Sequence, residues 1–94
     1  MSSWLEEQEI LNEQFWREKY SQYNIDERIR YWSGQVYQSM RWQGESIGNE
    51  YEGVFDKEWW KYACEREPNF PNLWPQIARN ARVDIHRANK LMGI

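Results

Sequence analysis

The sequence predicts an all-α protein, a compact bundle of about four helices in a single domain over residues 1–94. Two observations support this prediction. Aromatic residues make up 17% of the chain, and since each ring buries roughly 150–250 Å², they supply a core that the few aliphatic residues cannot. Apolar residues also recur at helical spacing, and the most regular stripe is Ile25, Ile29, Trp32, Val36 and Met40.

The first helix is predicted over residues 4–23. Ser3 and Glu6 have the spacing of a capping box, in which each side chain accepts a hydrogen bond from the other residue's backbone amide. Apolar residues occupy a wide sector of this helix, and glutamates occupy the opposite side. Such a pattern is typical of a helix that contacts two neighbours.

The second helix is predicted over residues 24–43 and carries the regular stripe. Asn24 and Glu27 repeat the capping-box spacing at its start. A Gly-rich loop is predicted at 44–53, because three glycines stand there without any apolar period. Gly34 lies inside the helix, where it costs up to about 1 kcal/mol relative to Ala. Its missing side chain would let another backbone approach closely.

The third helix is predicted over residues 56–67, with Asp56 as its cap and a proline directly after its end. A rigid connector is expected at 68–71, because it begins and ends with proline. The fourth helix is predicted over 73–92 and ends at Gly93, since glycine is the residue most often found just past a helix.

No catalytic or metal-binding constellation is recognisable. Cys64 and His86 are the single cysteine and the single histidine, whereas zinc sites require several such ligands at short spacing. A thiol and an imidazole could form a nucleophile and base pair, but an inert thiol and a solvated imidazole explain the two residues better. We therefore expect no enzyme activity, no metal and no cofactor.

The expected location is the cytoplasm, or the host-cell cytoplasm if the protein is viral. One cysteine cannot form an internal disulfide, which argues against a disulfide-stabilised secreted scaffold. The first residues lack the basic and apolar regions of a signal peptide. No stretch approaches the roughly 18 apolar residues of a membrane span, so no membrane partner is expected.

Three aromatic residues fall off the predicted core stripes. Tyr31 and Trp42 lie roughly opposite the stripe of the second helix, and Trp60 points away from the apolar face of the third. Either the bundle buries these rings, or they are exposed and anchor a partner. Tyr and Trp are enriched at interface hot spots, so the three residues are candidates for a partner-binding surface.

A second candidate surface is the polar side of the fourth predicted helix. It carries a basic face of Arg79, Arg82, His86, Arg87 and Lys90. The face either complements the acidic first helix or contacts an acidic surface outside the bundle. Asp84 stands at the edge of the apolar sector and is expected to pair with Arg87 or with an arginine of another helix.

These features predict a protein–protein interaction module, such as a small regulator, inhibitor or accessory subunit of the kind that phages and mobile elements encode. Its partner would be another protein or a second copy of the chain. One alternative is nucleic-acid binding through the basic fourth helix, although the net charge of −3 opposes it. A second alternative is a small-ligand or nucleotide sponge, which requires Trp and Arg side chains to converge.

Overall fold

The computed structural model describes residues 10–47 and 54–94, which form helices and contain no strand. Residues 10–14 are α-helical. They are followed by a π-helical turn, η1 (Phe15–Lys19), a 3-10 turn, η2 (Tyr20–Gln22), and four helices, α2 (Ile25–Ile47), α3 (Lys57–Arg66), α4 (Phe70–Asn80) and α5 (Ile85–Met92). The prediction of an all-α bundle is confirmed. The predicted cap at Ser3 and Glu6, and loop positions 48–53, lie outside the described residues.

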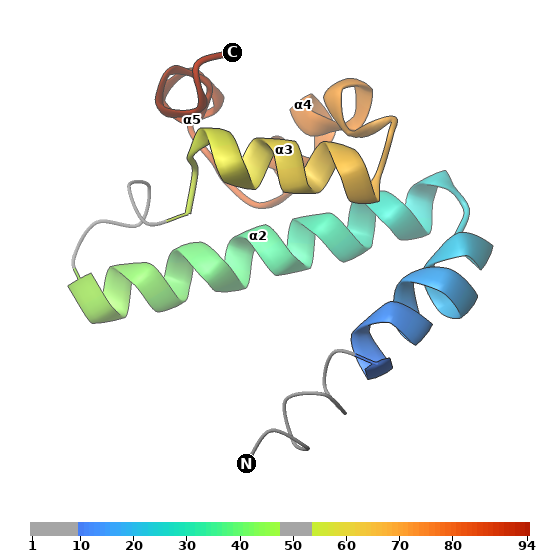
Figure 1. Ribbon diagram of the computed structural model, residues 1–94. Helices are drawn as coiled ribbons and strands as arrows, with labels where there is room; N and C mark the ends of the chain where they lie inside the picture. The colour runs from blue at the N-terminus through green and yellow to red at the C-terminus, as the bar shows by residue number, and fades with distance from the viewer. Residues whose placement is uncertain (1–9, 48–53) are drawn as a thin grey trace.

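Helix α2 is the long central element of the bundle (Figure 1). The segment 10–22 folds back beside the first turns of α2, and α3, α4 and α5 lie on the other side of it. Helix α4 packs against α2, and α3 packs against both α4 and α5. The sequence therefore places its most regular apolar stripe on the longest helix of the bundle.

Side-chain caps set where two of the helices begin. At the start of α2, the Glu27 amide donates to Asn24 Oδ1 at 2.9 Å, and the Asn24 amide donates to Glu27 Oε1 at 3.3 Å. At the start of α3, Asp56 Oδ1 accepts from the Trp59 amide at 2.7 Å. Both predicted caps are confirmed, because each depends only on residues three positions apart.

Two predicted boundaries are wrong. Helix α2 does not end at Gly44 but continues to Ile47, so glycine is accommodated inside the helix there. The residues 68–71 are not a separate connector, because α4 already begins at Phe70. Pro71 fits the first turn of α4, where a backbone amide has no helical partner to lose.

The single helix predicted over 73–92 is also wrong, because the chain breaks after α4. Arg82 adopts a left-handed backbone with φ of 60°. The Val83 amide donates to the Ala78 carbonyl at 2.8 Å, and the Arg82 amide donates to the Arg79 carbonyl at 3.2 Å. These two hydrogen bonds form a Schellman motif, which satisfies the last carbonyls of a helix and terminates it.

Helix α5 starts directly after this break. Asp84 is its N-cap, and Asp84 Oδ1 accepts from the Arg87 backbone amide at 3.3 Å. Asp84 thus contacts Arg87, a partner predicted for it, through the backbone amide of Arg87. Gly93 ends α5 in the left-handed conformation, with φ of 73°, which confirms the predicted stop.

The core confirms most of the stripe on α2. Trp32, Val36 and Met40 are buried and Ile29 is half-buried, but Ile25 is 48% exposed. Ile25 is the first residue of α2, at the end of the helix, and the core does not reach it. The other buried apolar residues come from η2, the residues before α3, the helices α3, α4 and α5, and the turn after α4: Tyr20, Val54, Phe55, Ala63, Phe70, Leu73, Trp74, Ile77, Ala78, Ala81, Ala88 and Met92.

Aromatic rings form a connected network through this core. One group surrounds Tyr20 in η2, just before α2, and a second surrounds Phe70 at the start of α4. The rings of Trp32 and Phe70, with centroids 5.1 Å apart, join the two groups. Aromatic residues therefore provide the main contacts between the N-terminal segment, α2 and the C-terminal helices.

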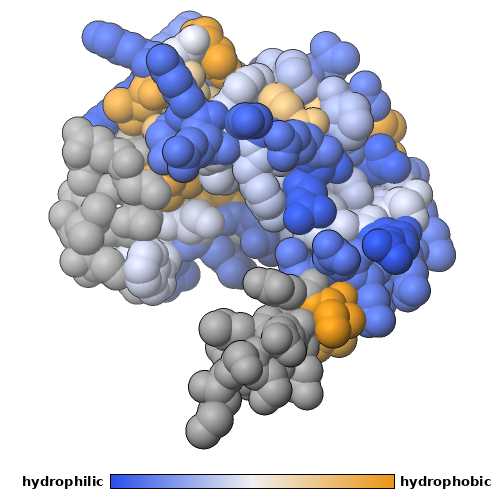
Figure 2. Space-filling model, in the orientation of Figure 1, coloured by the Kyte–Doolittle hydropathy of each residue, from blue (hydrophilic) through white to orange (hydrophobic). Residues whose placement is uncertain are grey.

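The visible surface in Figure 2 is largely hydrophilic, with smaller apolar areas. One apolar area lies beside the first described residues, where Ile10 and Leu11 are exposed. Within the described ranges, no helix combines the length and the apolar character that a membrane crossing requires.

Candidate protein-interaction site

The three off-stripe aromatic residues have different environments. Tyr31 is half-buried, and its ring centroid lies 5.4 Å from that of Phe15 and 5.5 Å from that of Trp16. Burial raises the pKa of the Tyr31 phenol above its usual value. Trp60 is also half-buried, with its ring 5.5 Å from Phe70. Trp42 is 62% exposed, so it alone of the three has the accessibility expected of an anchor.

The structure does not bring these three residues together. Trp42 follows Tyr31 by eleven residues of α2, which separates them by about 16 Å along the helix axis. Trp60 packs onto the start of α4 instead. Tyr31 and Trp42 do lie on the same side of α2, as their spacing predicts.

A cleft nevertheless opens on this flank of α2. Its volume is about 200 Å³, and its walls come from η1, α2 and α3. We call it the aromatic cleft, and its lining residues are Trp16, Tyr31, Trp32, Gln35, Val36, Ser39, Trp59 and Tyr62. Trp59 and Tyr62 contribute the α3 wall, the role that the sequence had suggested for Trp60.

One residue of the cleft wall, Trp16, carries a polar group without a partner among the described residues. The indole nitrogen Nε1 of Trp16 is buried, and no acceptor among the described residues pairs with it. A buried donor without an acceptor costs about 1–3 kcal/mol, so its presence is a marked exception to ordinary packing. The Arg66 guanidinium lies 5.2 Å from the Trp16 ring and 5.5 Å from the Tyr62 ring, close enough for cation–π attraction.

Exposed aromatic rings stand at the edge of the cleft. Tyr62 lines it and is 41% exposed. Gln35, Ser39 and Trp42 follow one another at helical spacing, so Trp42 extends the α2 wall of the cleft by one turn. The cleft thus combines a concave aromatic interior, a Trp16 indole nitrogen that has no acceptor among the described residues, and two accessible rings.

The predicted basic face is not a single surface. Arg79 belongs to α4 and Arg82 to the turn after it, whereas His86, Arg87 and Lys90 belong to α5. The break at Arg82 changes the direction of the chain and separates these cations. Arg82 instead lines a groove against α2, and His86 and Lys90 are exposed on α5.

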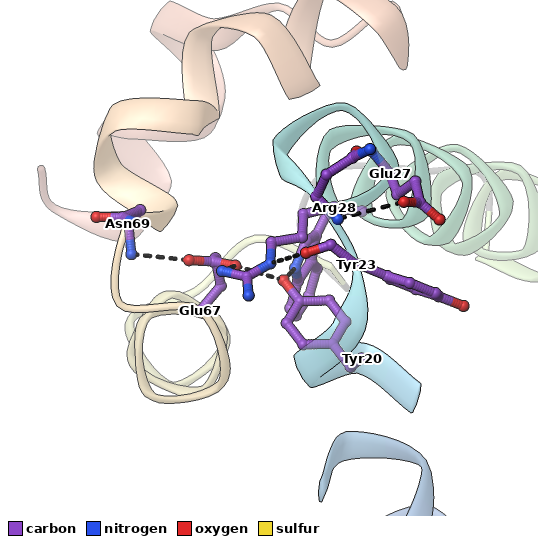
Figure 3. A network of polar contacts seen from close by, with 8 residues as sticks. Tyr20, Tyr23, Glu27, Arg28, Glu67 and Asn69 are labelled. Atoms are coloured by element: carbon purple, nitrogen blue, oxygen red, sulfur yellow. Dashed lines mark hydrogen bonds and ion pairs between the residues drawn. The ribbon is translucent and has the colours of Figure 1, made fainter. Parts of the chain in front are cut away.

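A buried polar network was not predicted from the sequence. Glu67 is fully buried at the end of α3 (Figure 3), and its Oε1 accepts from the Tyr20 hydroxyl at 2.7 Å and from Arg28 Nη1 at 3.2 Å. Its Oε2 accepts from the Asn69 amide at 3.0 Å. Trp32 Nε1 donates to the Tyr20 hydroxyl at 2.8 Å.

This network joins the N-terminal segment, α2 and the α3–α4 corner. Burial and the hydrogen bond to Glu67 together raise the pKa of the Tyr20 phenol far above its usual value. Arg28 also donates through Nε to the Tyr23 carbonyl at 3.0 Å. Because both carboxylate oxygens and the hydroxyl are satisfied from within the chain, the network is suited to holding the fold together.

The single cysteine and histidine are not hydrogen-bonded to each other in the described chain. Cys64 is half-buried on α3, and burial raises the pKa of its thiol, which disfavours the reactive thiolate. His86 is exposed on α5. No group of three or more acidic, histidine or cysteine side chains in the described ranges is placed to hold a metal ion.

No protein-family model, curated protein or solved structure was found to match the chain.

Proposed function

We propose that this chain is a non-enzymatic interaction module that binds a partner protein at the aromatic cleft. The observation that carries the proposal is a concave aromatic site in which one lining residue, Trp16, has an indole donor without an acceptor in the part of the chain that the structure describes. An acceptor from a partner would remove the cost of leaving this donor unsatisfied. The role is that of a small regulator, inhibitor or accessory subunit, and a single free cysteine suits a reducing compartment such as the cytoplasm.

The cleft defines the chemistry of its ligand. A volume of about 200 Å³ suits one bulky apolar side chain, and an adjacent carbonyl oxygen would accept from Trp16. Trp42 and Tyr62 would then cover the flanks of the inserted residue. Aromatic anchors of this kind contribute much of the affinity of protein interfaces. The ligand could come from a different protein or from a second copy of this chain.

The two alternative functions have weaker support. Nucleic-acid binding depended on one basic helix, and the break at Arg82 divides that helix. A nucleotide sponge requires arginines among the stacking rings, but the lining of the aromatic cleft contains none. Arg66 contacts Trp16 and Tyr62 through cation–π geometry and is already engaged.

The test compares binding by three single-residue variants. Trp42→Ser and Tyr62→Ser remove rings at the cleft, and Ile94→Ser removes an exposed apolar side chain after α5, outside the cleft. Affinity capture with quantitative mass spectrometry, and sedimentation of the protein alone, measure partner binding and self-association. We expect a captured protein, or a dimer, that is lost with Trp42→Ser and Tyr62→Ser and retained with Ile94→Ser.

The position of the contact is tested by the indole proton of Trp16. On addition of the captured partner, or on dimer formation, its NMR signal should move downfield as it gains an acceptor. Capture that is equal for all three variants would contradict the proposal, as would an unchanged Trp16 signal at saturation.

A further inference from the structure

A second concave surface lies on the opposite flank of α2 from the aromatic cleft. It is an open groove of about 920 Å³ between α2 and α4. A smaller hollow of about 330 Å³ shares Tyr37 and Arg82 with it and extends toward Arg41. We call this surface the basic groove, and the residues that define it are Arg30, Gly34, Tyr37, Arg41, Asn80 and Arg82.

Positive charge is concentrated along this groove. Arg30 and Arg41 belong to α2, and Arg82 faces them from the turn after α4. Within the described ranges, no hydrogen bond or ion pair engages the guanidinium of Arg30 or Arg82. Asp26 is the acidic residue of the lining, and although it precedes Arg30 by one helical turn, no ion pair joins the two.

The uncharged lining suits a peptide. A Cβ added to Gly34 would meet nothing within 4 Å, so no backbone of the described residues occupies the space above the glycine. A backbone from elsewhere can therefore approach α2 closely at this point. Asn80 is held by Gln76, whose Nε2 donates to Asn80 Oδ1 at 2.9 Å. Tyr37 is 47% exposed and offers an apolar ring beside these amides.

We propose that the basic groove binds an acidic peptide segment of a partner protein. Arginine forks match carboxylate groups in a bidentate geometry. Arg30 and Arg82 both line the groove, Arg30 from α2 and Arg82 from the turn after α4. The ligand is therefore an extended segment whose aspartate or glutamate side chains reach these two arginines while its backbone passes over Gly34.

The charge balance favours a peptide over a nucleic acid. Three arginines and one aspartate line the groove, and the whole chain carries a net charge of −3. A polyanion with a phosphate at every nucleotide would be repelled by the rest of the molecule. A short segment with a few carboxylates meets only the local positive charge.

The test uses fluorescence anisotropy with a labelled deca-glutamate peptide as the probe. We expect a dissociation constant of roughly 10–100 µM that rises with added salt. Arg30→Gln and Arg82→Gly should each weaken binding about tenfold, the loss of one charge-assisted contact. Arg79→Gln is the matched control, because it removes an exposed α4 cation outside the groove and should change the dissociation constant less than about twofold.

Two of the variants keep the experiment interpretable if folding is questioned. Arg82→Gly replaces a left-handed residue with the amino acid that best tolerates that backbone. Gly34→Met places a good helix former in open space, fills the floor of the groove and should also abolish binding. Urea unfolding of both variants should show a stability at least equal to that of the original chain.

The alternative outcomes are distinct. No binding of deca-glutamate at 1 mM, or equal binding by all variants, would overturn the proposal. Tighter binding of a ten-residue oligothymidylate than of deca-glutamate would assign the groove to nucleic acid instead. The amide signal of Gly34 should shift with the peptide while the indole signal of Trp16 does not, so the result is independent of the function proposed for the aromatic cleft.

Discussion

At the scale of single residues, the burial of Glu67 is the most demanding feature of the structure. A carboxylate in a dry interior is unfavourable unless a counter-charge and hydrogen-bond donors replace its water. Arg28 supplies the charge, and Tyr20 and the Asn69 amide supply the remaining donors. The stability of the chain therefore depends on residues 47 positions apart, Tyr20 and Glu67, remaining in contact.

The first prediction concerns this carboxylate. In Glu67→Gln the amide NH₂ would face either the Asn69 amide or the donors on Arg28 and Tyr20, so one donor loses its acceptor. Breaking a buried charge pair costs about 3–5 kcal/mol, and we expect a loss near the lower end because the shape is kept. Urea unfolding measures it. The control is Glu13→Gln, which removes an exposed pair with Arg17 at 3.9 Å and should cost less than about 0.5 kcal/mol.

The second prediction concerns alkaline pH. Burial and the bond to Glu67 raise the pKa of Tyr20 in the folded state above its unfolded value of about 10. Above pH 10 the unfolded chain releases this proton while the folded chain keeps it, so the free energy of unfolding must fall as pH rises. Raised pKa values at Tyr31 and Cys64 act in the same direction.

Urea titrations between pH 8 and 11 measure this dependence. Tyr20→Phe should be less stable at neutral pH, because it leaves Glu67 and Trp32 with one partner fewer. Its stability should fall less steeply above pH 10. A variant with the same slope as the original chain would show that Tyr20 does not carry the effect.

At the scale of elements, the ends of α4 and α5 use the same device with different residues. At the end of α5, the Ile94 amide donates to the Asn89 carbonyl at 3.0 Å around the left-handed Gly93. At the end of α4, Arg82 occupies the equivalent left-handed position. A residue with a side chain loses about 1–2 kcal/mol in this left-handed conformation. The turn between α4 and α5 therefore forms despite an unfavourable backbone conformation at Arg82.

The third prediction follows from this pair of helix ends. Arg82→Gly should raise the free energy of unfolding by about 1 kcal/mol, because glycine removes the left-handed penalty. Gly93→Ala should lower it by a similar amount, since the added Cβ is strained there and would lie 3.0 Å from Lys57 Cε. Thermal and urea unfolding measure both changes. Equal effects of the same sign would contradict the interpretation.

These helix ends also show which elements a sequence can predict. The starts at Asn24 and Asp56 were predictable, because a cap is a local pattern within four residues. The break at Arg82 was not, because arginine is not typical of a left-handed position. Asp84 was visible as a residue out of place on a continuous helix, and the structure shows that it starts a new one.

At the scale of the whole molecule, the fold class was predictable and the surfaces were only partly so. Helical spacing places Tyr31 and Trp42 on one flank of α2. Which rings line the cleft depends on how η1 and α3 are placed against that flank, and no local pattern encodes this placement. The sequence therefore pointed to Trp60 where Trp59 and Tyr62 form the wall, and it gave no sign that Glu67 would be buried.

The connected rings also bear on the binding that we propose at the aromatic cleft. Trp16, Tyr31 and Trp32 contact one another, and Trp32 contacts Phe70 across the core. These side chains have already lost their rotational freedom in the free protein, so the interior of the aromatic cleft is preorganised. A ligand would have to order only the exposed rings of Trp42 and Tyr62. The binding that we propose there would cost little conformational entropy, and a short contact segment would suffice for it.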